Sequence, residues 1–92
     1  MSTTGDLLND LLNQTVVIDV SSEFVFLGTL AAWDEYFLKL EDADVHDLRD
    51  TTTTRELYVV EAKQLGVRPN RNRVWIRREQ IVCVSALEDV LI

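Results

Sequence analysis

The chain alternates short apolar or β-branched runs with polar turns, the pattern of a small protein built mainly of strands. Residues 24–33 are apolar on both faces of an extended strand, so one face can fill an interior while the other needs a cover. Only Asp34 and Glu35 separate this run from the next, which predicts a β-hairpin. The pattern predicts five strands, at residues 15–20, 24–33, 36–46, 73–77 and 81–86, with the last two forming a second hairpin.

The N-terminal segment has the spacing of a short amphipathic helix. Its leucines stand at positions 7, 8, 11 and 12, and an acid, Asp6, precedes them. A hydroxyl at Thr3 or Thr4 is expected to cap the helix, which should end near Asn13, within residues 1–14.

A second helical pattern lies in an insert, residues 50–69, between the third and fourth predicted strands. A Thr53-x-x-Glu56 capping box predicts a helix over residues 55–65, and Gly66 is expected to end it. The β-branched residues near its start leave a strand as the alternative. The threonine tract before the helix is expected to be a solvated linker.

Closure of the predicted sheet raises a problem of unpaired edges. Gly28, inside a strand pattern, predicts a sharp bend, and small bent sheets tend to close into barrels. Five strands leave edges open, so the apolar last strand is expected to pair with another copy of the chain. The alternative is an edge covered by residues 87–92. The predicted interface residues are Val74, Ile76, Ile81, Val82, Cys83 and Val84.

Two segments carry a resemblance to a known family. The first contains Gly28, Leu30, Asp34, Tyr36 and Phe37, and the second contains Ile76 followed by Arg77. Together they resemble the two signature motifs of the Sm and Sm-like proteins, small RNA-associated rings. The resemblance covers nearly the whole chain and implies a strongly bent five-stranded small barrel with an N-terminal helix. It also implies rings of five to eight subunits, in which the fourth strand of one subunit pairs with the fifth of the next.

The resemblance implies a site for single-stranded RNA, with two departures. In the family an aromatic residue stacks on a base, an asparagine hydrogen-bonds it and an arginine covers its other face. Here Leu38 follows Phe37 where the asparagine is expected, and an arginine replaces the glycine of the second motif. We therefore expect altered base selectivity, or a protein-binding scaffold without a nucleotide site. The implied RNA-binding residues are Asp34 as support, Tyr36 as the stacking ring, Phe37, Arg77 and Arg78.

The charge is unevenly distributed along the acidic chain. The net charge of −7 opposes indiscriminate nucleic-acid binding. Residues 1–50 hold eleven acids and two bases (−9), and residues 51–92 hold five acids and seven bases (+2). Five arginines fall within residues 68–78, a stretch that contains no acid. They predict either a local basic patch or a solvated basic strand edge.

The remaining chemistry predicts a binding protein and not an enzyme. The acids around His46, at positions 42, 44, 47 and 50, lack the spacing of a calcium loop and are expected to be solvated, so no metal or other cofactor is expected. Cys83 is the single cysteine, and with no visible signal peptide or membrane span a cytoplasmic location is expected. Trp33 and Trp75 are expected in packing or interface contacts. Length and the absence of a linker predict one domain over residues 1–92.

Overall fold

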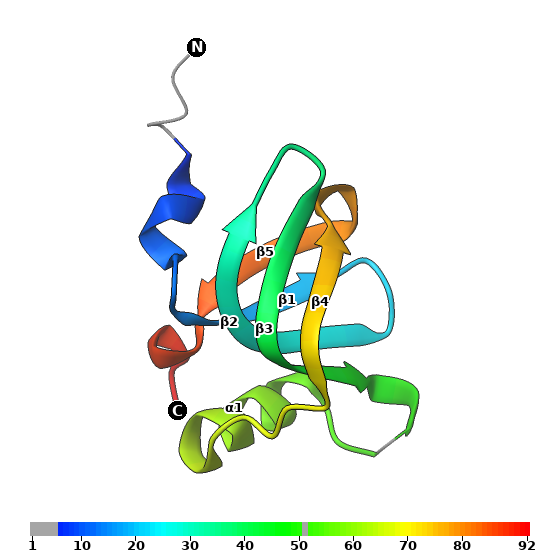
Figure 1. Ribbon diagram of the computed structural model, residues 1–92. Helices are drawn as coiled ribbons and strands as arrows, with labels where there is room; N and C mark the ends of the chain where they lie inside the picture. Colours follow the sequence, from blue (N-terminus) through cyan, green and yellow to red (C-terminus); the bar gives the residue numbers. More distant parts are fainter. Residues whose placement is uncertain (1–5, 51) are drawn as a thin grey trace.

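The computed structural model describes residues 6–50 and 52–92, which form one bent antiparallel sheet with a helix at one end (Figure 1). In chain order the elements are a 3-10 helix (Leu7–Leu11), β1 (Thr15–Val20), β2 (Phe24–Trp33), β3 (Phe37–Asp47), α1 (Arg55–Leu65), β4 (Arg71–Arg77) and β5 (Ile81–Ala86). Short 3-10 turns, Leu48–Asp50, Arg78–Gln80 and Leu87–Asp89, follow β3, β4 and β5. The expected class, a strongly bent five-stranded sheet with a helical insert before the fourth strand, is confirmed.

The strand order in the sheet is β4-β3-β2-β1-β5, with every pair antiparallel. The hairpin of β2 and β3 is confirmed. The predicted second hairpin is wrong, because β4 pairs with β3 and β5 pairs with β1. The 3-10 turn Arg78–Gln80 sends the chain across from one edge of the sheet to the other. The sheet therefore ends in two edge strands that are consecutive in sequence and not paired with each other.

Gly28 lies where β2 needs the absence of a side chain. The pairing register between β2 and β3 shifts between Leu27 and Thr29, on either side of this glycine. A Cβ at Gly28 would stand 3.1 Å from both the Ala43 Cα and the Glu41 carbonyl oxygen. Glycine thus lets the two strands approach closely at the bend, as the sequence predicted.

The sheet buries apolar side chains on both faces, in two separate clusters. The inner cluster fills the concave side of the bent sheet, with Val16, Ile18, Val20, Leu30, Leu38, Leu40, Ala43 and Ile76. The outer cluster lies between β1, β2, α1 and the C-terminal turn, with Val17, Val25, Leu27, Val59, Ala62 and Leu87. The two apolar faces of the second strand are explained, because each faces one of the clusters.

The insert helix α1 has the predicted bounds, Arg55–Leu65, so the strand alternative for this segment is wrong. Its N-cap is Thr54 and not the predicted Thr53: the Thr54 side chain accepts a hydrogen bond from the Leu57 N–H. Gly66, at a φ of 93°, ends the helix in a conformation that favours glycine.

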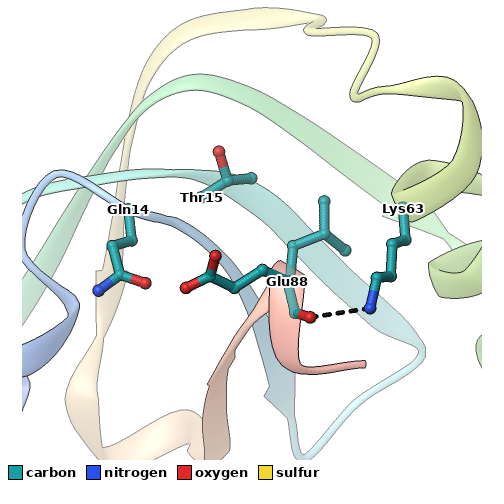
Figure 2. Close-up of a pocket in the computed structure, with 5 residues that line it drawn as sticks. Gln14, Thr15, Lys63 and Glu88 are labelled. Atoms are coloured by element: carbon teal, nitrogen blue, oxygen red, sulfur yellow. Dashed lines mark hydrogen bonds between the residues drawn. The ribbon is translucent and has the colours of Figure 1, made fainter. Parts of the chain in front are cut away.

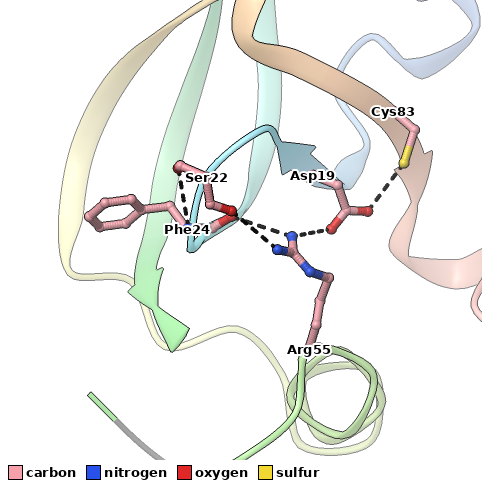
Figure 3. Close-up of polar contacts among 5 residues, drawn as sticks. All are labelled: Asp19, Ser22, Phe24, Arg55 and Cys83. Atoms are coloured by element: carbon pink, nitrogen blue, oxygen red, sulfur yellow. Dashed lines mark hydrogen bonds and ion pairs between the residues drawn. The ribbon is translucent and has the colours of Figure 1, made fainter. Parts of the chain in front are cut away.

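A charged contact fixes the start of α1 to the sheet (Figure 3). The Arg55 guanidinium donates to the Asp19 carboxylate at 2.7 Å and reaches the carbonyl oxygens of Phe24 and Ser22 at 3.4 Å. On the other side of Asp19, the Cys83 thiol of β5 donates to the second carboxylate oxygen at 3.2 Å. One carboxylate on β1 therefore links the insert helix to an edge strand.

The N-terminal helix is shorter and tighter than predicted. The described part is a 3-10 helix, Leu7–Leu11, and its N-cap is Asp6, whose side chain accepts from the Leu8 N–H at 2.9 Å. The capping residues predicted for it, Thr3 and Thr4, lie outside the described residues. Leu8 and Leu11 pack against the inner cluster, so the predicted apolar face is used. In the described parts of the chain, no helix has the length and apolar character needed to cross a membrane.

Candidate functional site

The turn between β2 and β3 is organised by one carboxylate. Asp34 Oδ1 accepts the backbone N–H groups of Tyr36 and Phe37, both at 2.8 Å, and the Asp34 N–H donates to the Phe37 carbonyl at 2.9 Å. These hydrogen bonds, that from Phe37 first, hold the pKa of the Asp34 carboxyl below its ordinary value, and the Arg78 charge acts in the same direction. Asp34 therefore stays ionised and keeps the turn in one conformation.

The chain following β4 completes this turn from the other side. The Arg78 N–H donates to the Tyr36 carbonyl at 2.8 Å, and the Arg78 guanidinium donates to the Asp34 carbonyl at 2.8 Å. Arg77 lies directly opposite Phe37 in the pairing of β3 with β4. The structure therefore brings together all five predicted RNA-binding residues, at the end of the molecule opposite α1 (Figure 1).

Arg78, which stands where the family motif has glycine, has a structural role here. Besides the turn carbonyl, its guanidinium lies 3.8 Å from the Asp6 carboxylate, which also accepts from the Trp33 indole N–H at 3.1 Å. The N-terminal segment, the β2–β3 turn and the connection to β5 thus meet around Arg78. Sequence reasoning missed Asp6 as part of this arrangement, because nothing local links it to residues so distant in the chain.

The aromatic and cationic groups of the turn are presented to solvent. Tyr36 is 67% exposed and Phe37 is at the margin of exposure. Arg77 is exposed and forms an ion pair of 2.7 Å with Glu79, which is equally exposed. Such a pair is weak and screened by salt, so the guanidinium can exchange its partner for a phosphate. The turn thus offers an exposed tyrosine ring and, opposite the next residue Phe37, an exposed cation.

Leu38 cannot supply the amide that the family uses to recognise a base. Its side chain is 1% exposed and belongs to the inner cluster, between β2 and β4. The position of a base-reading asparagine is here a core position, which removes hydrogen bonding to a base edge from this residue.

The predicted interface residues occupy the two edge strands in different ways. Val82 is 68% exposed and Cys83 is exposed on β5, while Val74, Ile81 and Val84 are half-buried against the inner cluster. Ile76 is buried, so only its backbone lies at the edge. The tail does not take the place of a partner strand: Leu87 packs into the outer cluster and leaves Val82 open.

Two hollows flank these elements. One, of about 210 Å³, lies beside the β4 edge and is lined by Val20, Ser22, Phe26, Trp75, Ile76, Arg77 and Gln80. The other, of about 430 Å³, lies on the tail side and is lined by Gln14, Thr15, Lys63, Leu87 and Glu88 (Figure 2). There the Lys63 ammonium donates to the Glu88 carbonyl at 2.8 Å and to that of Val90, so it ties the tail to α1.

The acidic segment around His46 is used for internal contacts. Arg49 pairs with Asp47 at 2.8 Å and lowers the pKa of Asp47 to about 2, while the Tyr58 hydroxyl donates to Asp44. The His46 ring stacks on Tyr58 with 4.1 Å between centroids. Among the described residues, no group of three or more histidine, cysteine or acidic side chains could hold a metal ion.

Comparison with known proteins identifies the fold. No protein-family model and no curated protein matches the sequence. Solved structures do match. A Pyrococcus abyssii Sm protein in complex with a uridine heptamer gives a TM-score of 0.60 at 17% identity, over 92% of this chain and 99% of that chain. The P. aerophilum SmAP1 heptamer gives 0.56 at 19% identity, over 94% and 95%. A chain of the NatC complex bound to CoA gives 0.57 at 15% identity, over 86% and 82%. The chain has the Sm-like fold.

Proposed function

We propose that this chain is a ring-forming Sm-like protein that binds single-stranded RNA, with base selectivity different from that of a uridine site. The binding place is the turn between β2 and β3 that carries Tyr36, which we call the Tyr36 turn. The role is binding and not catalysis, and we place it in the cytoplasm. The observation that carries the RNA proposal is the Asp34-organised turn, which presents the exposed Tyr36 ring next to Phe37, the residue that Arg77 faces across the strands.

The two unpaired edges support ring assembly. Among the described residues, β4 and β5 each have a sheet neighbour on one side only, and a long exposed edge strand is a template for pairing with another chain. Pairing of β4 in one copy with β5 in the next satisfies both edges and repeats until the assembly closes. Two Sm-fold structures whose names state a heptamer or heptameric protein match this fold.

The side chains at the edges favour a second copy of this chain as the occupant. Val82 projects from β5 with most of its surface exposed, and the hollow beside β4 is lined partly by Val20, Phe26 and Ile76. An apolar side chain on one edge and an apolar hollow beside the other are complementary. Burying a valine contributes about 1.5–3 kcal/mol per contact.

The turn supports RNA binding through stacking. A base stacked on one aromatic side chain contributes about 1–3 kcal/mol and is sequence-tolerant, because every base has a π-face. We assign stacking to Tyr36, phosphate or base contact to Arg77, and support of the turn to Asp34 and Arg78. In a ring, each subunit presents one such turn, so weak single contacts add up on one strand of RNA.

The buried Leu38 supports the change in selectivity. Hydrogen bonds to base edges select a base, whereas stacking does not. With an apolar core residue at this position, uridine has no amide partner from Leu38. We therefore expect the ring to bind oligo-U and oligo-A with similar affinity.

A second candidate function is a protein-interaction ring that keeps the assembly without a nucleotide site. The net charge of −7 and the Arg77–Glu79 ion pair favour it. The match to a chain of the NatC complex is a further argument, since that chain, whose fold resembles this one, belongs to a protein complex.

Two measurements test these proposals. Native mass spectrometry of the full chain should give a closed oligomer, and Val82→Glu should give smaller species; a wild-type monomer at micromolar concentration would contradict the assembly.

Fluorescence anisotropy with oligo-U and oligo-A should show binding that Tyr36→Ala weakens by roughly tenfold or more, in line with the loss of one stacked base. Leu57→Ala, an exposed apolar residue of α1, is the matched control and should bind as wild type. Absence of binding at tens of micromolar in low salt would leave the protein-interaction ring.

A further inference from the structure

The outward-facing side chains of β4 form a basic and aromatic row. Because successive residues of a strand point to opposite sides, Arg73, Trp75 and Arg77 share one side, while Ile76 points into the inner cluster. Arg71 continues the row at the start of the strand and is also exposed. We call Arg71, Arg73, Trp75 and their neighbour Lys39 the β4 outer face. Along β4 this face adjoins Arg77, the residue of the strand that lies at the Tyr36 turn.

Cross-strand neighbours add to the same surface. In the register of β3 with β4, Lys39 lies opposite Trp75, and its ammonium stands 5.7 Å from the centre of the indole ring. Glu41 lies opposite Arg73 but forms its ion pair with Lys39, at 3.7 Å. The surface therefore holds three cations and one acid around a tryptophan that is 56% exposed.

Arg71 and Arg73 differ from the arginines that are paired with an acid, such as Arg49 and Arg55. Arg49 pairs with Asp47 and Arg55 with Asp19, each within 2.8 Å. In the described part of the chain, neither Arg71 nor Arg73 forms an ion pair; the Arg71 guanidinium donates only to the neighbouring Asn70 carbonyl. On a protein with a net charge of −7, these unneutralised cations mark the place for an anionic partner.

We propose that the β4 outer face binds the phosphodiester backbone of a single-stranded nucleic acid, as a second contact surface beyond the Tyr36 turn. Cations at every second residue of a strand stand about 6.8 Å apart, a spacing of the order of that between successive phosphates of an extended strand. A positively charged groove or ridge that follows the backbone, with aromatic rings for the bases, is the general device for binding single strands without sequence preference.

The tryptophan favours a nucleic acid over an acidic peptide. Its exposed indole lies within the row of cations, where a base can stack on it, and an acidic peptide has no group that needs such a ring. Pairing of β4 with a second copy uses the backbone groups of the strand edge. Trp75 lines the hollow beside that edge, whereas Arg71, Arg73 and Lys39 do not. The proposal extends the RNA-binding function above, but its contacts do not require Tyr36.

The test compares salt dependence among matched charge variants of the full chain. Each phosphate contact contributes about 0.7 to the slope of log affinity against log salt for a single strand. Arg71→Gln with Arg73→Gln should therefore lower the slope for a mixed-sequence 20-mer RNA by about 1.4. Arg49→Gln removes the same type of charge elsewhere and should leave the slope unchanged. Circular dichroism should show that each variant is folded.

Trp75 gives an independent readout. In a Trp33→Phe background, adding the RNA to protein at constant concentration should quench Trp75 fluorescence, and the Arg71 and Arg73 double variant should reduce this quenching. Unchanged slope and quenching in the double variant would overturn the proposal. If Tyr36→Ala still weakens binding in that case, the turn site stands alone.

The reverse result separates the two proposals. If Tyr36→Ala binds as wild type while the double variant loses affinity, the β4 outer face stands and the turn site falls. If poly-L-glutamate binds with the same affinity and slope as the RNA, the face serves acidic protein segments, and the nucleic-acid proposal is overturned.

Discussion

The inner and outer apolar clusters are built from different parts of the chain, although they share the same sheet. The inner cluster draws its buried residues from β1, β2, β3 and β4, which span most of the sequence. The outer cluster draws on β1 and β2, on the insert helix α1 and on the turn after β5. The inner cluster forms because the sheet bends around it. The outer cluster forms because the insert helix and the C-terminal tail cover the convex side of the sheet.

This difference separates the proposed RNA-binding turn and docking edges from the part of the molecule that supports them. The Tyr36 turn and the β4 and β5 edges all adjoin the inner cluster, through Leu38, Ile76 and Val84. Helix α1 lies at the opposite end and is fixed by Arg55 and Lys63. We therefore expect damage to the inner cluster to abolish assembly, and damage to the outer cluster to loosen α1 first.

The largest effect is expected from Leu40→Ala in the inner cluster, and this variant tests the difference between the two clusters most directly. Leu40 is completely buried between β2 and β4, so the variant loses apolar burial and leaves a cavity that the strands cannot readily fill. We expect a loss of about 3–5 kcal/mol in the free energy of unfolding, measured by urea denaturation, together with loss of the proposed oligomer. A loss below 1 kcal/mol would contradict the central place given to this cluster.

The matched deletion in the outer cluster is Leu87→Ala. Leu87 is buried at its periphery, on a short 3-10 turn. The same chemical change should cost about 2 kcal/mol, because the tail can move into the space. Hydrogen exchange should show the amides of α1 losing protection before those of β2 and β3. Equal loss of protection in both regions would show that the clusters unfold together.

A smaller effect is expected at the start of α1. Thr54→Ala removes the side-chain acceptor of the Leu57 N–H and should cost about 1 kcal/mol of stability. Thr52→Ala, two residues earlier and exposed, is the control and should stay within about 0.5 kcal/mol of wild type. Thermal unfolding followed by circular dichroism measures both. Equal destabilisation by the two variants would contradict Thr54 as the cap.

The link between α1 and β5 can be followed through the Cys83 thiol. The hydrogen bond to Asp19, with burial and the Asp19 charge, raises the pKa of Cys83 above its ordinary value. Asp19→Asn should lower this pKa, so iodoacetamide should alkylate Cys83 several times faster at pH 8. Asp10→Asn, an exposed acid of the N-terminal helix, is the control. An unchanged rate in Asp19→Asn would mean that the thiol does not contact this carboxylate in solution.

The smallest expected effect concerns the acid stability of the Tyr36 turn. The folded-state pKa of Asp34 is lowered, so its contribution is complete above the ordinary value of 3.8 and is lost only as pH falls through the lower, folded value. In an NMR titration, the amides of Tyr36 and Phe37 should shift below pH 3.8. A transition centred above 3.8 would contradict the hydrogen bonds drawn from these amides to Asp34.

The sequence was a good guide wherever local chemistry decides the structure. Period-two alternation identified the strands. Helical spacing with Gly66 at the end gave the bounds of α1, although the predicted cap, Thr53, was one residue too early. The five residues of the proposed turn site lie together in the structure, and two short motifs had already grouped them. Their backbone hydrogen bonds to Asp34 follow from the short polar connection alone.

Contacts between segments that lie far apart in the sequence could not be predicted from local sequence patterns. The connection after β4 resembles a hairpin turn, and only the bend of the whole sheet sends β5 to β1 instead of β4. Asp19 and Arg55 are 36 residues apart, so nothing in the local sequence pairs them. The N-terminal leucines have helical spacing, but a 3-10 helix capped by Asp6 places Leu8 and Leu11 on the inner cluster in a single short turn.

The short crossing at Arg78–Gln80 has a geometric consequence. It joins the first and last strands of the sheet order, so its length and the hydrogen bond from Arg78 to the Asp34 carbonyl constrain the angle between the two proposed docking edges. In a closed assembly that angle determines how many copies complete the circle. Lengthening this crossing by one residue is thus a direct way to change the subunit count without touching either docking strand.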